Sequence, residues 1–450
     1  MAKEQYLTAP LKTDKMPTGI PYIVGSEAAE RFSYYGMNSI LVIFMTKYMM
    51  NSQGQPDHLA DVEAQVWYHN FVSLLYFLPL IGAFLADAVL GKYRTVLILS
   101  FVYCFGHLAL AINDTRTGLF VGLGLIALGA GGIKPCVSAI VGDQFGTSNQ
   151  HLLERVYAWF YFSINIGSAF STLLIPELLQ RYGPKVAFGV PGIAMFIATV
   201  MFWIGRKKFV HIPPVGVRSY FRELRHHESI KAILNLLILV PFAAMFWALW
   251  QQNFSSWVLQ AEKLDRHMFG REWLPAQIQT FNPVFILLML PLFSYVIYPL
   301  LGKVWRLTPL RKFGLGLFTN ALAFAIVAMI QQRLDGGEKP HVIWQIVAFL
   351  VLTMGEVMVS VTHLEFAYTQ APRKMKTLVM CTYLGAIALG NVFTARINAL
   401  IGSGTLDLSG AAYFWFFVKV MLVTAVLWLV VSPFYRGKTH IQDEADAPSA

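Results

Sequence analysis

The sequence predicts an all-α polytopic membrane protein, and three observations support this fold class. The chain has 450 residues, of which 56% are hydrophobic and 13% are charged, whereas a soluble domain carries about 25% charged residues. The apolar residues run in uninterrupted blocks of about 20 or more, long enough for a helix to cross a bilayer. Many Trp and Tyr residues lie near the ends of these blocks, as interfacial anchors do.

Twelve such apolar blocks, separated by polar breaks, predict twelve transmembrane helices. They cover residues 18–50, 62–90, 94–113, 118–145, 155–179, 187–205, 230–260, 277–301, 311–332, 342–371, 375–401 and 411–434. The polar start, residues 1–17, lacks the short apolar core and the cleavage site of a signal peptide. We therefore expect the first span to remain in the mature protein.

The distribution of Lys and Arg predicts the orientation. An even number of spans places both termini on one side, and most Lys and Arg residues outside the spans fall on that side. Because cytoplasmic loops carry the excess of Lys and Arg, both termini are expected to be cytoplasmic. The net charge of +10 is then a topology signal, and we expect no nucleic-acid partner.

The longest predicted cytoplasmic loop divides the spans into two sets of six. Gly91-Lys92-Tyr93-Arg94 follows the second span of the first set, and Gly302-Lys303-Val304-Trp305-Arg306 follows the second span of the other. Parallel six-helix repeats joined by a basic linker are the plan of the major facilitator fold. The predicted organisation is a first half at 1–205, a linker at 206–229, a second half at 230–434 and a cytoplasmic tail at 435–450.

Ionisable residues within the spans are the candidates for function, because such groups are costly in a bilayer. In the first span Glu27 and Arg31 have the favourable i,i+4 order, and Glu30 shares their face. Lys134 lies in a glycine-rich fourth span beside Pro135, and lying against Glu27 or Glu30 it would balance the cluster. A static ion pair that only fixes helix packing is the alternative interpretation.

Two further groups are isolated in apolar helices. His69 falls on one face of the second span with Tyr76, and an imidazole titrates near neutral pH, which suits a proton relay. Glu356 in the tenth span has no basic residue within a turn, so it must be protonated, paired across helices or paired with a ligand. A hydrogen-bonded core histidine and a protonated packing acid are the alternatives. We expect His107 to be structural and assign no role to His363.

Together these residues predict a polar cavity between the halves, to which Asn165, Trp247, Gln251, Gln252, Asn282 and Tyr383 contribute polar and aromatic groups. One half offers the cations Arg31 and Lys134, and the other offers the anion Glu356. A ligand that bridges them needs a negative and a positive end, as a peptide zwitterion has.

Other classes of function are weakly supported. The sequence contains no zinc-protease, nucleophile-elbow or phosphate-loop motif, so we expect no enzyme, although intramembrane hydrolysis by paired acids remains an alternative. The three cysteines, Cys104, Cys136 and Cys381, lie in apolar blocks without metal-ligand spacing. We expect neither a metal nor a cofactor.

Six motifs in order resemble those of the proton-dependent oligopeptide transporter (POT) family, a branch of the major facilitator superfamily. They are Glu27 to Gly36, Gly82 to Thr95, Gly131 to Val137 with Gly142 to Phe145, Phe160 to Ser168, Phe246 to Leu249 with Ser256 to Ala261, and Gly355-Glu356 with Leu364 to Tyr368. The resemblance covers nearly the whole chain. It implies a symporter that imports di- and tripeptides with protons across the cell inner membrane, and we expect it to act as a monomer in the lipid bilayer.

The resemblance also implies roles for matching residues. Proton coupling falls to Glu27, Glu30, Arg31, His69 and Lys134. Substrate binding falls to Arg31, Tyr35, Tyr76, Lys134, Asn165, Trp247, Asn282, Glu356, Ser360 and Tyr383. Asp87, Lys92 and Arg94 are implied to have gating or structural roles.

Some features depart from the family pattern. Many members carry an acid where this chain has Gln251, and that acid takes a proton in the seventh span. His69 matches a histidine found in animal members and rarely in bacterial ones, so proton handling is expected to shift to the second span. The short 206–229 linker and 333–341 loop favour a bacterial inner-membrane protein. Two alternatives remain: a carrier of nitrate or another anion, which needs the cations but not Glu356, and a transporter-like receptor that binds peptide and signals.

Overall fold

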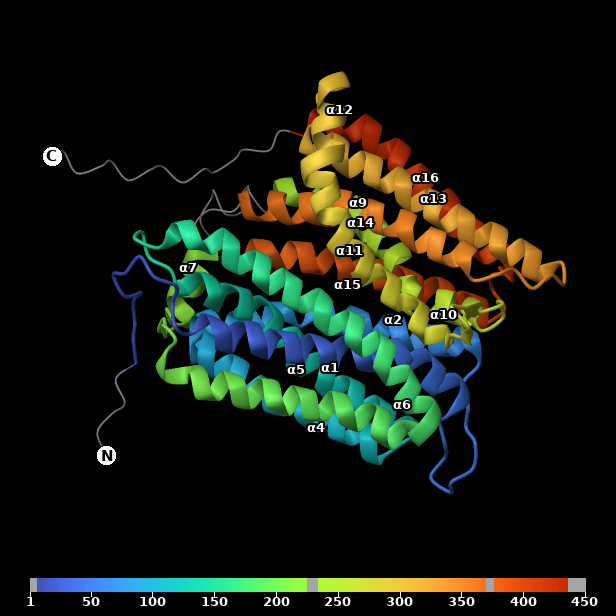
Figure 1. Ribbon diagram of the computed structural model, residues 1–450, viewed down its shortest axis with the longest axis horizontal. Coiled ribbons are helices and arrows are strands. Elements are labelled where there is room, and N and C mark those ends of the chain that lie inside the picture. The colour runs from blue at the N-terminus through green and yellow to red at the C-terminus, as the bar shows by residue number, and fades with distance from the viewer. Residues whose placement is uncertain (1–5, 225–233, 370–375, 436–450) are drawn as a thin grey trace.

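The computed structural model describes residues 6–224, 234–369 and 376–435. The expectations about the tail after residue 435 and about part of the linker lie outside these residues. Almost all of the described secondary structure is helical, and the helices run roughly along one direction in two layers of the bundle (Figure 1). The blue-to-green helices of the first half form the lower layer, and the yellow-to-red helices of the second half form the upper one (Figure 1).

The helices of the first half follow the predicted spans closely. They are α1 (Ile20–Lys47), α2 (Asp61–Phe77), α3 (Pro79–Phe84) with the π-helical turn η1 (Leu85–Leu90), α4 (Lys92–Ile112), α5 (Arg116–Asp143) and α6 (Leu153–Ile204). Two short 3₁₀ turns, η2 (Gln150–Leu152) and η3 (Gly205–Lys207), precede and follow α6. Helix α6 contains two predicted spans, which meet at Gly183 with φ +77°, a left-handed conformation that glycine adopts readily.

The second half is less regular. Its helices are α9 (Val240–Trp250), α10 (Ser256–Ala261), α11 (Phe281–Leu292), α12 (Tyr298–Val304), α13 (Pro309–Asp335), α14 (Ile343–Thr369), α15 (Lys376–Gly402) and α16 (Ala411–Val431). Shorter elements are the turns η4 (Gln251–Phe254), η5 (Pro275–Thr280), η6 (Phe293–Ile297) and η8 (Ser432–Phe434), and the strands β1 (His267–Met268) and β2 (Arg271–Glu272), which pair antiparallel.

The predicted seventh span, 230–260, is wrong as a single continuous helix. It breaks after Trp250 into the 3₁₀ turn η4, and Ser255 then has the non-helical angles φ −128° and ψ −93° before α10 begins. The broken residues Gln251 to Ser255 are all buried. Irregular backbone at membrane depth is tolerated where protein or a polar cavity satisfies it, and in transporters such breaks accompany binding sites.

Nine helical segments among the described residues are long and apolar enough to cross a membrane, by length and composition. Helix α1 is not one of them, and it carries the charges of Glu27, Glu30 and Arg31. One of the nine, Gln150–Lys207, contains both predicted spans of α6. The multi-pass helical architecture is confirmed, while the count of twelve spans and the cytoplasmic placement of the termini stay predictions.

The linker between the halves is partly ordered against the first half. Val210 pairs with Leu7, and the Val215 N–H donates to the Asp87 carbonyl at 2.8 Å. A short helix within the linker, α7 (Val217–Leu224), then packs Tyr220 against Phe84 with ring centroids 5.5 Å apart. The described part of the predicted loop therefore contains a helix, and its contacts hold the linker at the end of the bundle where η1 ends.

Small residues let two helices of the first half approach closely, as the sequence predicted. A Cβ atom added at Gly131 of α5 would lie 2.6 Å from the Leu75 carbonyl oxygen of α2, a distance that a real Cβ does not tolerate. Because α5 and α2 touch here, the side chain of Lys134, one turn further along α5, is brought beside Tyr76 of α2.

Candidate functional site

The acid–base cluster in α1 forms as the sequence predicted. Arg31 Nε lies 3.0 Å from Glu27 Oε1 and 2.5 Å from Glu30 Oε2, and all three side chains are buried, with at most 9% exposed. Neither contact is a hydrogen bond, because Arg31 Nε has no hydrogen-bond partner among the described residues. In the described part of the chain, both Glu30 oxygens lack a hydrogen bond. The cluster therefore holds one carboxylate more than its single cation satisfies.

The expected ion pair between Lys134 and this cluster is not formed. Within the described residues no carboxylate lies within ion-pair distance of Lys134 Nζ. The ammonium instead sits over two aromatic rings, 4.5 Å from the centroid of Tyr34 and 5.0 Å from that of Tyr76. The prediction failed because it considered only opposite charges, whereas an aromatic face also attracts a cation. Lys134 is thus a half-buried cation without an anionic partner among the described residues.

A small cavity lies behind the α1 cluster, inside the first half. Its volume is about 20 Å³, and Glu27, Glu30, Ser26 and Ser100 contribute its polar lining. A space of this size accommodates about one water molecule. The cavity places room for water directly beside Glu30, whose carboxylate oxygens lack hydrogen bonds within the described residues.

His69 is fully buried and joins the two halves. Its Nδ1 lies 2.7 Å from Asn391 Oδ1 of α15, and its Nε2 lies 3.0 Å from Ser255 Oγ at the break between η4 and α10. The neighbouring Tyr68 hydroxyl donates to Gln251 Oε1 at 3.4 Å. His69 therefore contacts the irregular part of the seventh span, which is where the sequence departs from the family pattern.

Glu356 of α14 is held by two donors from different elements. Its Oε2 accepts a hydrogen bond from the Trp250 indole Nε1 at 2.9 Å and one from Asn282 Nδ2 at 2.8 Å. Asn282 also donates to Thr353 Oγ1 at 3.0 Å. Of the three alternatives that the sequence left open for Glu356, contact across helices agrees with this geometry, although its partners are neutral donors and the sequence interpretation missed Trp250. Its only signal was its place one turn after Trp247.

The other predicted substrate residues are partly gathered around Glu356. Ser360 Oγ lies 3.1 Å from the Tyr383 hydroxyl, and the Tyr383 ring meets that of Trp247 edge-on, with centroids 6.2 Å apart. Tyr35 of α1 stacks on Phe254 of η4 at 6.2 Å. Asn165 is not drawn into this group by a hydrogen bond within the described residues, since its Nδ2 donates to the Tyr161 carbonyl of its own helix.

The predicted gating residues lie at the opposite end of the first half from Lys47. Lys92 Nζ forms an ion pair of 2.7 Å with Asp143 of α5. The Asp87 carbonyl holds the linker at Val215, and Arg94 is exposed. Lys92 and Asp143 thus tie α4 to the end of α5.

His107, expected to be structural, is fully buried in the interior of the first half. Its Nε2 lies 2.8 Å from Ser33 Oγ, and its ring stacks on Tyr103 with centroids 5.0 Å apart. The buried His363 lies beside Tyr383, with ring centroids 4.9 Å apart. The side chains of Glu365 and Cys381 lie outside the described residues.

Polar contacts between the halves gather at the end of the bundle that holds Lys47. Lys47 Nζ lies 2.6 Å from Glu262 Oε1, the Tyr413 hydroxyl donates to Gln65 at 3.2 Å, and Gln277 Nε2 donates to the Leu173 carbonyl at 2.9 Å. We call this group the interhalf latch.

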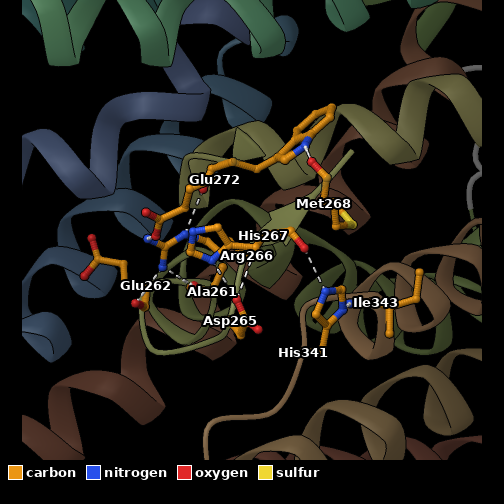
Figure 2. A network of polar contacts seen from close by, with 10 residues as sticks. Ala261, Glu262, Asp265, Arg266, His267, Met268, Glu272, His341 and Ile343 are labelled. Atoms are coloured by element: carbon orange, nitrogen blue, oxygen red, sulfur yellow. Dashed lines mark hydrogen bonds and ion pairs between the residues drawn. The ribbon is translucent and has the colours of Figure 1, made fainter. Parts of the chain in front are cut away.

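The segment after Glu262 is fixed by one arginine. Figure 2 shows the Arg266 guanidinium reaching the Glu272 carboxylate and the carbonyls of Ala261 and Glu262, at 2.7 to 2.9 Å. The first half has an ion pair at the same end. Arg116 Nε donates to Asp57 Oδ2 at 2.7 Å, and hydrogen bonding from Arg116 holds the pKa of Asp57 below its usual value. Both halves therefore carry ion pairs next to the interhalf latch.

The sequence matches the profile of the POT family over residues 93–224 and 215–416. Peptide transporter family 1 of Drosophila melanogaster is 36% identical over 366 residues, which cover 71% of this chain and 48% of that protein. Human solute carrier family 15 member 2 is 36% identical over 368 residues, covering 71% of this chain and 49% of that protein. The chain spans about half the length of these curated relatives.

Solved structures match over nearly the whole chain. The structure of the POT family transporter PepTSo has a TM-score of 0.85 and 33% identity, and the match covers 94% of this chain and 99% of that one. An auto-inhibited POT family peptide transporter has a TM-score of 0.84 and 34% identity, covering 95% and 99%. The predicted major facilitator fold is confirmed, and the relatives are transporters rather than enzymes. This chain belongs to the POT family of membrane transporters.

Proposed function

We propose that this chain is a proton-coupled symporter that imports di- and tripeptides by alternating access. One observation carries the proposal: Arg31 and Lys134 lie in one half, and a fixed carboxylate, Glu356, lies in the other. A zwitterionic peptide has the charges to join them. The names of the relatives, which are peptide transporters, support the same substrate class.

In the proposed bound state, the substrate carboxylate meets Lys134 and Arg31, and its ammonium group meets Glu356. Lys134 suits this role because aromatic rings hold its ammonium without neutralising it. Backbone groups of the peptide would reach Asn165 and Asn282. Its side chains would lie against Tyr35, Tyr76, Trp247, Ser360 and Tyr383.

Proton coupling is proposed to use the excess of acidic over basic groups in the α1 cluster. Glu27 and Glu30 compete for the single positive charge of Arg31, whose Nε lies within ion-pair distance of both carboxylates. A proton arriving on either acid removes this competition and leaves Arg31 with one anionic partner. Lys134 and the rest of the guanidinium then carry positive charge that a peptide carboxylate can neutralise. His69 is the proposed second proton-handling group, because its ring bridges the halves.

The two halves, 1–205 and 230–434, are proposed to rock about the 206–229 linker. The interhalf latch, with Lys47 and Glu262 at 2.6 Å, holds them together at one end. We assign that end to the outside, in keeping with cytoplasmic termini. Substrate and proton together would shift the population between the two arrangements. Each inward charge gains about 2.3 kcal/mol per 100 mV of membrane potential.

The proposed setting is the cell inner membrane, with a single chain as the transporting unit. Uptake of radiolabelled dialanine into proteoliposomes tests the proposal. With an inward proton gradient, dialanine should accumulate above its outside concentration, and a protonophore should reduce the inside level to equilibrium. Accumulation that survives the protonophore, or the absence of saturable uptake, would overturn it.

An anion carrier is the competing candidate, and the same liposomes separate the two. The hydrogen-bonded carboxylate of Glu356 at the interface disfavours a small anion there. Nitrate in excess should therefore leave dialanine uptake unchanged. Competitive inhibition by nitrate, together with nitrate accumulation, would favour the anion carrier.

A further inference from the structure

Trp250 is the last residue of α9, and its indole is buried between neighbouring side chains. The residue is 6% exposed. Its ring packs edge-on against Trp247, with centroids 5.2 Å apart, and lies tilted against Phe254 at 5.9 Å. These two contacts fix the plane of the indole, and the break in the chain after Trp250 allows Phe254 to fold back beside it.

The indole N–H has one partner, Glu356 Oε2, at 2.9 Å. Asn282 Nδ2 donates to the same oxygen at 2.8 Å and is itself tied to Thr353. Two donors from α9 and α11 thus converge on one carboxylate oxygen. Hydrogen bonds to an ionised acceptor are roughly twice as strong as those between neutral groups, so this oxygen is strongly held.

The other carboxylate oxygen of Glu356, Oε1, lacks such donors in the described part of the chain. No hydrogen bond to Oε1 occurs among the described residues, and Glu356 as a whole is partly exposed rather than buried. Oε1 has no hydrogen-bond partner among these residues, yet it is not one of the fully buried oxygens. Part of its surface is therefore accessible to solvent. One oxygen is anchored, and the other is open to a ligand.

Two other tryptophans show that an indole in this region need not find a partner. Trp247, one turn earlier in α9, and Trp257 in α10 are both buried, and neither Nε1 has a hydrogen bond within the described part of the chain. The hydrogen bond from Trp250 to Glu356 is therefore specific to this residue and does not follow simply from burying a tryptophan in this region.

We infer that Trp250 is a positioning residue for substrate selection: with Asn282, it anchors Glu356 Oε2 so that Oε1 faces the substrate's ammonium group. This inference rests on the proposed function for the identity of the ligand. Its physical basis is preorganisation, since a carboxylate already fixed in the bound geometry loses little rotational freedom on binding. The bulk of the indole also excludes water from the anchored oxygen.

The test uses Trp250→Phe in the purified full-length protein, with Trp257→Phe as the matched control for exchanging a buried indole for a phenyl ring. The two ligands are dialanine and N-acetyl-dialanine, which lacks the ammonium group. Losing a hydrogen bond to a charged group should weaken dialanine binding about tenfold in Trp250→Phe. Binding of N-acetyl-dialanine should be unchanged, and Trp257→Phe should not alter the ratio of the two affinities.

A conservative variant and a ligand-free measurement complete the test. Trp250→His keeps a ring N–H and should recover part of the dialanine affinity. The infrared carboxyl band of Glu356, identified by its loss in Glu356→Gln, should shift in Trp250→Phe and stay in Trp257→Phe. This readout needs no substrate, so it tests the contact even if the protein transports something other than peptides. An unshifted band, or equal weakening of both ligands, would overturn the inference.

Discussion

Replacing Glu356 by Gln tests the assignment of the substrate's ammonium group to this side chain. The amide retains one oxygen, which can still accept from Trp250 at 2.9 Å and Asn282 at 2.8 Å. Its NH₂ group then takes the place of the open oxygen. The substrate's ammonium would face a donor where the wild-type protein offers an anionic acceptor.

The size of the effect follows from this exchange. A hydrogen bond to a charged group contributes about 1.5–3 kcal/mol, and 1.4 kcal/mol corresponds to a factor of ten. The affinity for dialanine should therefore fall by roughly 10- to 150-fold. N-acetyl-dialanine has no ammonium group to lose, so its affinity should change by less than about threefold.

Equilibrium binding of both ligands to the purified protein provides the assay. Glu338→Gln is the matched control, because Glu338 pairs with Arg333 in an exposed loop and should leave both affinities unchanged. If Glu356→Gln weakened both ligands equally, the carboxylate would not meet the ammonium group, and the reasoning about the open oxygen would be refuted.

Three further predictions follow from other parts of the molecule. Lys134→Ala should lose gradient-driven uptake while residual peptide exchange becomes insensitive to pH, and uphill accumulation by this variant in sealed liposomes would place the coupling elsewhere. His69→Ala should reduce proton-driven uptake more than exchange measured without a gradient, whereas a proportional loss of both would make His69 structural. Arg116→Gln should lower the thermal midpoint at pH 7 by removing the interaction that depresses the pKa of Asp57. A carboxyl group whose pKa is lower in the folded than in the unfolded protein stabilises the fold at any pH above its unfolded pKa of about 3.9. This stabilisation is lost as the pH falls through the folded pKa. The midpoints of wild type and Arg116→Gln should therefore converge below about pH 4, and a constant difference would contradict this.

The parts of the fold that depend on local pattern could be predicted from the sequence. Apolar block length locates the helices, and the glycines around Gly131 indicate the close approach of α5 and α2. The i,i+4 spacing of Glu27 and Arg31 was enough to predict their ion pair, because both residues lie on one helix. The break after Trp250 had no local signal, since neither Gly nor Pro marks it.

The contacts between helices could only be predicted in part. Opposite charges suggested that Lys134 pairs with the α1 acids, but the rings of Tyr34 and Tyr76 surround its ammonium instead. The contact between Trp250 and Glu356 joins residues 106 positions apart. Which faces of two distant helices meet depends on tilt and packing, and a single sequence does not encode these in any local spacing.

The central claim is that protons and peptide cross together, and a peptide gradient tests it most directly. Liposomes containing the protein and an internal pH dye start at equal pH, with the membrane potential clamped at zero. Dialanine is then added outside. The account predicts that the lumen acidifies as dialanine enters, because the peptide gradient draws protons inward. Saturable entry of dialanine with no change of internal pH would contradict it.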